Sequence, residues 1–536
     1  MIDRRSVLGV LGAAASLPGE AVARPAPDAV RFDHGVASGD PTATGAILWT
    51  RVTPPAGHAA PIAVRWHVMD GGRVVASGRT EARASRDWTV KVEPRTLKPG
   101  KPYRYAFEAA GVRSPEGQVR TLPVGATPDV VLAVASCALY PGGLFNAYRA
   151  IADLPRVDAV VHLGDYIYEY GQEGYGGAIG RKLGRLVEPA HEIVTLADYR
   201  ARHAQYKRDP DLQAAHARAA WTVVWDDHET ANDSWTGGAE NHQPAAEGDW
   251  RARKAAALQA YFEWMPIRDP RPGRPWEAIN RSFRFGDLAT LAMVETRLLA
   301  RSEQTEIDDR ADPAFFAAAL KTRADPSREM LGEGQRRWLE GELAASVRRG
   351  EPWQVLGNQV VMARVAGVPI DPAKVAPSYR ERVLAAQASY AAGLPSNLDA
   401  WDGYPAARER LYASFRRAGS RPLVLSGDSH AHWANRLADA SGTPVAAEFG
   451  ATAITSPSIG DVMPDVPVGQ LLADANEEVL WCDQHAKGYV LLTLTPEAAR
   501  AEYRAVSTVT ARPFAQTTLA TYEVRAGDAQ VAMRRV

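Results

Sequence analysis

The pattern of hydrophobic and polar positions changes near residue 125 and divides the chain into two parts. Residues 30–122 hold short segments rich in β-branched and aromatic residues, separated by turn signals such as Asp-Gly-Gly and Ser-Pro-Glu-Gly. The five strands expected there are GAILWTRV, IAVRWHVMD, VVASGRTEA, DWTVKVE and YRYAFEAAG. Because no helical periodicity competes with them, residues 30–122 predict an N-terminal β-sandwich of fibronectin-III or immunoglobulin-like type.

After the linker TLPVGATPD, apolar runs alternate with amphipathic helical stretches at residues 196–219 and 332–350. The strong strand candidates are DVVLAVASC, VDAVVHLGD, AWTVVWDDHE, PWQVLGNQVV and RPLVLSGDSH. GYVLLTLTPE and RAEYRAVS follow as a closing antiparallel pair. This alternation predicts an α/β catalytic domain over residues 129–510, with a mixed sheet flanked by helices, and leaves residues 511–536 as a C-terminal extension.

Four of the predicted strands end in side chains of the kind that bind metals. In open α/β sheets, ligands gather outside the carboxyl ends of the strands. The four ends are Ser136-Cys137, Gly164-Asp165 with Tyr168, Asp226 to Glu229 with Asn232 and Asp233, and Gly427 to His430 with His432. A single aspartate at a strand end is usually a turn residue, but four such ends together favour a metal site.

The residue types narrow the choice of metal. Several carboxylates at one point repel one another unless cations offset their charge. Thiolate and phenolate suit ferric iron, whereas oxygen-rich positions suit calcium, magnesium or manganese. The chain has only 2 cysteines, which excludes a four-sulfur zinc site and leaves a Cys137–Cys482 disulfide open as the structural alternative.

Composition and motifs exclude other functions. The 536 residues carry a net charge of −1, so no basic excess indicates a nucleic-acid partner. We find no Gly-x-Ser-x-Gly elbow, no P-loop and no dinucleotide fingerprint, which argues against serine hydrolases, P-loop nucleotidases and Rossmann enzymes.

The ordered motifs resemble those of the PhoD-type alkaline phosphatases and phosphodiesterases, a family of the metallophosphoesterase superfamily. The matching segments, in order, are FDHGVASGDPTATGAILWTRV, VASC, HLGDYIYEYG, YRARHAQYKRDPDLQAAHA, VVWDDHETAND, MLGEGQRRWL, VLGNQVVM and LVLSGDSHAHW. They extend over roughly residues 31–500. The resemblance implies a metallophosphoesterase-type sandwich of mixed sheets, preceded by the N-terminal domain of that family.

The resemblance also implies a cluster of iron(III) and calcium, with roles that carry over by position. Cys137 and Tyr168 would bind the ferric ion, and Asp165 would bridge the ions. Asp227 would bind the second metal, and His228 would support the leaving oxygen. The remaining implied ligands are Asp428, His430 and Asn232, the last as a calcium or phosphate contact. Where the superfamily has Asp-x-His, this chain has Cys137 and Leu139, so Tyr168 takes the place of the missing histidine.

The expected activity is hydrolysis of phosphate monoesters and diesters by a metal-bound hydroxide, for phosphate scavenging. A phospholipase of D type or another narrow phosphodiesterase on the same fold is the first alternative, and a non-catalytic binding protein is the second. No substrate-binding residue is assigned. Arg297 is a candidate phosphate contact, but an ion pair with Glu295 or another neighbour is the favoured interpretation.

The N-terminus predicts export. Arg4 and Arg5 precede an apolar segment, Val7 to Leu17, and the small-residue pattern Ala-Val-Ala at 21–23. We interpret residues 1–23 as a twin-arginine signal peptide, with an arginine pair in a general secretion signal as the alternative. The apolar segment is too short to span a bilayer, so no stable membrane anchor is expected. The protein would therefore pass through the twin-arginine machinery to the periplasm or the exterior.

Overall fold

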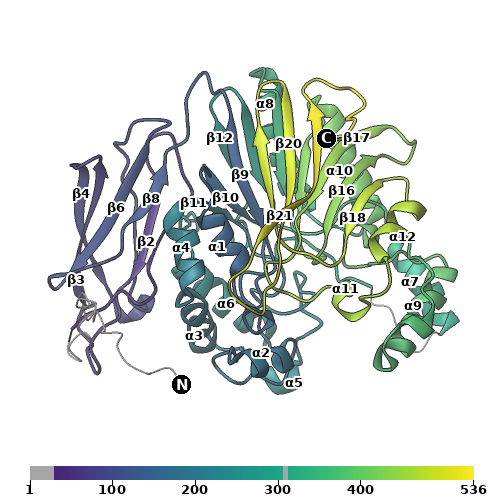
Figure 1. Cartoon of the computed structure of the whole chain (residues 1–536), viewed down its shortest axis with the longest axis horizontal. Coiled ribbons are helices and arrows are strands. Elements are labelled where there is room, and N and C mark those ends of the chain that lie inside the picture. The colour runs from purple at the N-terminus through teal and green to yellow at the C-terminus, as the bar shows by residue number, and fades with distance from the viewer. Residues whose placement is uncertain (1–28, 306–311) are drawn as a thin grey trace, which may run out of the picture.

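The structure is a computed structural model that describes residues 29–305 and 312–536 (Figure 1). The predicted signal peptide, residues 1–23, lies outside the described residues. Within the described part of the chain, no helix has both the length and the apolar character needed to cross a membrane.

The N-terminal part is built from two small sheets that share one core. The first contains β4 (Arg73–Ala82), β3 (Ile62–Asp70), β6 (Pro102–Ala109), β7 (Val112–Arg113) and β8 (Gly117–Arg120). The second contains β1 (Val36–Gly39), β2 (Ile47–Arg51) and β5 (Thr89–Val92). Val64 and Phe107 of the first sheet and Leu48 of the second belong to the same buried cluster. All five strands expected from the sequence are therefore present.

The second of these sheets continues into the catalytic part of the chain. β1 pairs in parallel with β11 (Ala220–Val223), through Ser38 and Gly39. The result is a 10-stranded sheet in the order β22-β21-β20-β19-β9-β10-β11-β1-β2-β5. The N-terminal region thus shares backbone hydrogen bonds with the sheet that carries the candidate site.

The centre of this sheet is the parallel set β9 (Val130–Ala135), β10 (Ala159–His162) and β11. β19 (Lys487–Leu494) and β20 (Ala498–Val506) extend it as the expected antiparallel pair. Residues 511–536, predicted as a C-terminal extension, add two further strands to this sheet. β21 (Gln516–Arg525) pairs along β20, and β22 (Arg534–Arg535) pairs with β21, because alternating apolar residues such as Tyr522 and Val524 bury one face of β21.

A seven-stranded mixed sheet packs against the first. Its order is β12 (Arg281–Phe285), β13 (Ala289–Met293), β14 (Trp353–Gly357), β15 (Leu423–Ser426), β17 (Pro444–Gly450), β16 (His432–Ala438) and β18 (Val479–Asp483). Val134 and Val161 of the first sheet share one buried cluster with Leu291, Val355 and Leu425 of the second. The five strong strand candidates are confirmed as β9, β10, β11, β14 and β15.

Helices lie outside the two sheets (Figure 1). The helical stretch predicted at 196–219 is two helices, α3 (Leu196–Lys207) and α4 (Pro210–Arg218), since Pro210 starts a new helix that Asp209 caps. The stretch predicted at 332–350 is α8 (Gly332–Arg348). The other helices of the described residues are α1 (Asn146–Ala152), α2 (Gly177–Leu183), α5 (Pro244–Glu247), α6 (Trp250–Trp264), α7 (Pro313–Arg323), α9 (Arg380–Ala391), α10 (Pro405–Ala418), α11 (Ile459–Val462) and α12 (Val468–Ala475).

Candidate metal centre

The carboxyl ends of the parallel strands from both sheets meet at one place. A bridge between Ser136 and Ala453 joins the end of β9 to the segment after β17. Gly164, after β10, has a φ of +107°, and a Cβ at this position would lie 2.4 Å from the backbone nitrogen of Asp226. Only glycine fits this close approach, so the strand ends that carry Asp165 and Asp226 lie directly against each other.

Strained backbone is concentrated at these strand ends. Cys137, Asp165, Asp428 and His430 all have positive φ values, between 56° and 60°. This region is sparsely populated by residues with a Cβ, and such outliers persist where the surrounding structure holds a functional geometry. Three of the four strand ends named from the sequence therefore carry this unusual local conformation.

The first ligand group joins Cys137, Asp165 and His430, whose ligand atoms all lie within 4.8 Å of one another. The Tyr168 hydroxyl donates to Asp165 Oδ2 at 3.0 Å and lies 3.4 Å from His430 Nε2. His430 Nδ1 is 2.7 Å from the Pro457 carbonyl, so that nitrogen donates and Nε2 faces Tyr168 with its lone pair. Thiol, phenol, carboxyl and imidazole thus meet at one point.

The second ligand group joins Asp165, Asp227 and His228, again within 4.8 Å. Asp165 belongs to both groups, so its two carboxylate oxygens can serve neighbouring ions. Asp165 Oδ1 is buried and has no hydrogen-bond partner among the described residues. A buried carboxylate oxygen without a donor is costly, and a cation is the simplest partner for it.

The third acidic group, Asp226, Asp227 and Asp428, already holds a cation. The buried guanidinium of Arg297 lies 2.5 Å from Asp226, 3.3 Å from Asp428 and 3.8 Å from Asp227. It also pairs with Asp399 at 2.7 Å. The favoured interpretation of Arg297 as an ion-pair residue agrees with this geometry, but Glu295 was the wrong partner.

Glu295 instead binds backbone. Its carboxylate accepts the backbone N–H groups of Arg297, Leu298 and Leu299 and the indole N–H of Trp225. It therefore shapes the turn that directs Arg297 into the acidic group.

In the metal-free chain, the protein environment opposes ionisation of Cys137, Tyr168 and Asp165. Asp227 differs, because the charges of Arg297 and His228 outweigh burial and lower its pKa. Burial, followed by the charge of Asp165, raises the pKa of the Cys137 thiol well above its usual range. Burial also raises the pKa of Tyr168 and of Asp165, and neighbouring aspartates add to the effect on Asp165. Since bound cations favour the ionised forms of thiol, phenol and carboxyl groups, these side chains suit a metal better than an empty site.

His228 is held by a buried carboxylate. Its Nδ1 lies 2.7 Å from Glu169 Oε2, which leaves Nε2 for the ligand group. Although burial opposes ionisation, the charges of Asp227, Glu169 and Asp165 raise the pKa of His228 well above its usual value. Glu169 itself also accepts from the Asn232 backbone and the Asn241 side chain. The imidazole is therefore oriented and favoured in its protonated form.

Some candidate residues named from the sequence have side chains that bind or pack outside the ligand groups. The Asn232 amide nitrogen donates to Glu240 at 3.1 Å, so its side chain is directed to that carboxylate. The ring of His432 packs on Tyr503 and Trp481. Cys137 and Cys482 are both free thiols, so the disulfide alternative is wrong.

The sequence pattern names Asp226 and Glu229 as part of a strand end but gives them no role, and it does not place Arg297 in the acidic group. Asp399 and Glu169 are absent from the candidates. One signal was available for Arg297. β13 ends at Met293 and pairs in parallel with β14, so the segment Glu295-Thr296-Arg297 follows a fifth strand end of the same kind. Glu169 lies within the segment HLGDYIYEYG, but it does not directly follow a predicted strand, so the strand-end pattern does not point to it.

Glu229 ties two strand ends together. Its carboxylate accepts the backbone N–H groups of Asp165 at 3.1 Å, Tyr166 at 2.6 Å and Asp226 at 2.9 Å. Burial raises the pKa of Glu229 to about 8, and these backbone bonds oppose that rise. The side chain is therefore a structural clamp beneath the two ligand-bearing turns.

We expect Glu229→Ala to lower the free energy of unfolding by about 3 kcal/mol, because three buried N–H groups lose their acceptor. Urea unfolding of the purified variant measures this change. Glu240→Ala, which alters an exposed glutamate of the same segment, is the control and should change stability by less than about 0.5 kcal/mol. Equal stabilities for the two variants would contradict the clamp.

Comparison with known proteins agrees with this geometry. The family model described as PhoD-like phosphatase matches residues 132–503, and the model for the N-terminal domain of PhoD-like phosphatases matches residues 18–123. Alkaline phosphatase D of Bacillus subtilis (strain 168) is 35% identical over 509 residues, covering 92% of this chain and 80% of that protein. A solved structure described as the structure of PhoD superposes with a TM-score of 0.77 at 32% identity, covering 94% of this chain and 92% of the other. The chain therefore belongs to the PhoD-like phosphatase family and is a phosphoesterase.

Proposed function

We propose that the protein hydrolyses phosphate monoesters and diesters at a metal cluster held by the converging strand ends. The observation that carries this proposal is the position of Asp165, which belongs to two adjacent ligand groups and has a buried oxygen without a donor. Such a shared carboxylate is the arrangement that a site with two neighbouring ions needs. The name of the relative, alkaline phosphatase D, supports activity on phosphate esters.

The donor set fits iron(III) and calcium. Cys137, Tyr168, Asp165 and His430 would hold the iron, since ferric iron favours ionised thiol and phenol groups. Asp165 and Asp227 would hold calcium through oxygen, with Asp428 at the margin of the cluster beside Arg297. When bound, the cations would act as Lewis acids on phosphate oxygens and lower the pKa of a coordinated water. Asn232 would have to turn away from Glu240 to reach such an ion, so the structure gives its proposed ligand role little support.

His228 is our candidate for the group that faces the leaving oxygen. Glu169 fixes its Nδ1, so Nε2 is directed to the ligand group that contains Asp165 and Asp227. A protonated imidazole at this position donates a proton to the departing alkoxide. Tyr168 packs against the imidazole with the two rings tilted by 33° and their centroids 4.2 Å apart, which limits rotation of the imidazole.

The finer fold class and the location belong to the same proposal. We classify the two packed mixed sheets as a metallophosphoesterase-type sandwich and the N-terminal region as a fibronectin-III or immunoglobulin-like sandwich. We also propose export by the twin-arginine machinery to the periplasm or the exterior, from the arginine pair and cleavage pattern of residues 1–23.

The decisive experiment combines metal analysis with a substrate panel at alkaline pH. Purified protein should contain iron and calcium and should hydrolyse a nitrophenyl monoester and a bis-nitrophenyl diester. Phosphatidylcholine in the same panel separates this activity from a phospholipase of D type. Hydrolysis that persists in protein free of iron and of every divalent cation would contradict the proposed mechanism.

The two cysteines allow a controlled test of whether Cys137 binds iron. Both thiols are buried and free, but only Cys137 belongs to a ligand group. We expect Cys137→Ala to lose most of its bound iron and at least about 10-fold in activity, whereas Cys482→Ala retains both. Iron per chain, measured by elemental analysis beside kcat, tests this; equal iron content in the two variants would argue against ligation by Cys137.

A further inference from the structure

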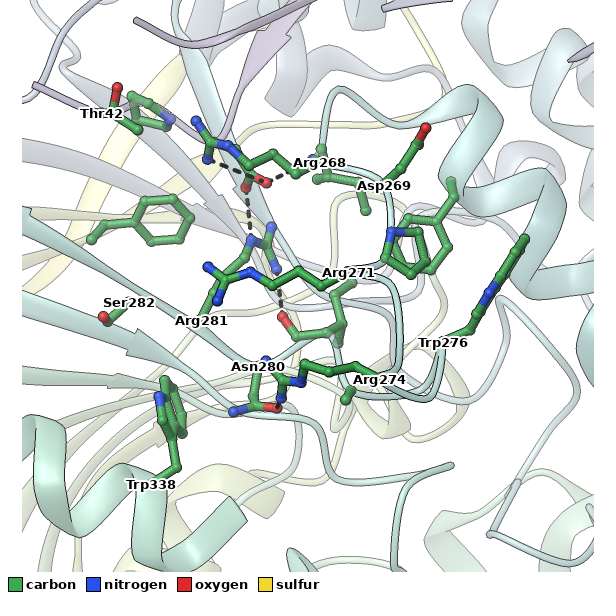
Figure 2. Close-up of a pocket in the computed structure, with 18 of the residues that line it drawn as sticks. Thr42, Arg268, Asp269, Arg271, Arg274, Trp276, Asn280, Arg281, Ser282 and Trp338 are labelled. Carbon is green, nitrogen blue, oxygen red and sulfur yellow. Dashed lines mark hydrogen bonds and ion pairs between the residues drawn. The ribbon is translucent and has the colours of Figure 1, made fainter. Parts of the chain in front are cut away.

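A cavity lies where the N-terminal region meets the catalytic sheets (Figure 2). Its volume is about 510 Å³, within the range of small-molecule sites. Residues 40–42 form one wall, the loop at 267–276 forms another, and the start of β12 with Trp338 of α8 closes it. The residues that line this cavity and the residues of the metal-ligand groups are separate sets.

Part of the cavity wall is a fixed ionic framework. Arg281 pairs with Asp40 at 2.7 Å, and its guanidinium also donates to the carbonyls of Ile279 and Val223. Arg268 pairs with Glu93 at 2.6 Å and donates its backbone N–H to Asp40. These two arginines are therefore neutralised, and they join the N-terminal sheet to β12 and to the loop after α6.

Two further arginines are not neutralised. Within the described residues, Arg271 takes part in no ion pair or hydrogen bond through its side chain, and Arg274 donates only to the neutral Asn280 amide oxygen at 3.2 Å. Figure 2 shows both side chains extending from the loop across the cavity. A guanidinium presents a planar set of donors that matches the oxygens of phosphate and sulfate groups.

The acidic residues of the lining do not compete for these two arginines. Asp269 pairs with Lys91 and with Arg86. Glu342 accepts the hydroxyl of Ser282 at 2.8 Å. Asp40 is held by Arg281, and Glu342 keeps its charge but forms no ion pair with Arg271 or Arg274 within the described residues. The positive charge of these two arginines is therefore open to a ligand.

The same cavity offers apolar surface and a stiff loop. Trp276, which is 44% exposed, and Trp338 both line it and can pack against the carbon skeleton of a ligand. Pro270, Pro272 and Pro275 alternate with the free arginines along the loop and restrict its backbone. A restricted loop loses less conformational entropy when it binds a ligand.

We propose that this cavity is a binding site for a small organic molecule that carries two or more phosphate or sulfate groups. Arg271 and Arg274 would each bind one anionic group, and the tryptophans would contact the organic part. The site is separate from the metal centre, and the proposal does not depend on the function proposed for that centre.

Isothermal titration with two probes tests the site and its chemistry. Methylenediphosphonate resists phosphoester hydrolysis and represents phosphate ligands, and benzene-1,3-disulfonate represents sulfated ones. We compare the full chain with Arg271→Ala/Arg274→Ala and with a control pair, Arg65→Ala/Arg79→Ala. The control removes two exposed arginines that lie opposite each other on β3 and β4, away from this cavity.

The full chain and the control should bind at least one probe at a site that the Arg271→Ala/Arg274→Ala protein lacks or binds at least about 10-fold more weakly. Binding of only one probe identifies phosphate or sulfate as the preferred group and supports the site. Matching thermal unfolding midpoints show that the exposed substitutions leave the fold intact. Equal stoichiometry and affinity in the three proteins, or binding of neither probe, would overturn the proposal.

Discussion

Asp165→Asn should lower phosphoesterase activity by about 1,000-fold or more and sharply reduce the metal content. The amide keeps the size of the side chain but cannot bridge two cations as a carboxylate does. Asp165 is the one residue shared by the Cys137 and Asp227 ligand groups, so its loss affects both. Activity assays and elemental analysis on the same preparation measure the two effects together.

The same substitution should have the opposite effect on the metal-free fold. Burial and the charges of Asp227, Asp226 and Glu229 raise the pKa of Asp165 in the folded chain. The folded carboxyl therefore binds its proton more tightly than the unfolded one, and metal-free wild-type protein loses stability as the pH rises above about 4 until it passes the folded pKa. Asp165→Asn lacks this loss, so after chelation it should unfold at a temperature equal to or above that of wild type at neutral pH.

Asp158→Asn is the control for both measurements. Asp158 precedes β10, whereas Asp165 follows it, and the Asp158 carboxylate binds Arg156 and the Val131 backbone. This variant should keep its metal and most of its activity. A metal-free Asp165→Asn protein that is clearly less stable than metal-free wild type would indicate a structural role for the carboxylate and argue against the proposed site.

The convergence of the strand ends can be predicted from the sequence because parallel strands all run in the same direction. Once apolar runs alternate with helices, the residues after each run must gather at one edge, so Cys137, Asp165, Asp227 and Asp428 were expected together. The glycines at 164 and 427 are part of the same signal. A Cβ at Gly427 would lie 2.6 Å from Ser136 Oγ, so the small residue that marks the strand end also permits the approach.

The parts of the site and of the fold that the sequence does not predict depend on contacts between segments that are distant in sequence. Arg297 reaches Asp226, Asp399 and Asp428, separated from it by 71, 102 and 131 positions, and no local pattern encodes those pairings. The place of β21 in the large sheet was missed for a related reason. Its pairing partner, β20, was predicted, but the alternation that makes residues 516–525 a further strand was assigned to an extension.

Arg297→Met should lower the free energy of unfolding by about 3–5 kcal/mol in metal-free protein, the second large effect that we expect. The arginine side chain has no exposed surface and stands between Asp226, Asp399 and Asp428. Its removal leaves buried carboxylates without their cation. Asp226→Asn in the same background should restore part of the loss, and urea unfolding of the two single variants and the double variant gives the coupling energy. Strict additivity of the two substitutions would contradict the pairing.

The effect of added calcium on the unfolding temperature shows whether Arg297 acts as a cation for the acidic group or only fills space. In the wild-type chain its guanidinium occupies the acidic group of Asp226, Asp227 and Asp428, where a metal ion would otherwise meet three carboxylates. In Arg297→Met that group is open, so added calcium should raise the unfolding temperature of the variant more than that of wild type. Arg297→Lys keeps a positive charge at the site and should show the smaller, wild-type response. If calcium stabilises all three proteins equally, Arg297 is not substituting for a cation, and the acidic group is a structural ion-pair network beside the metal centre.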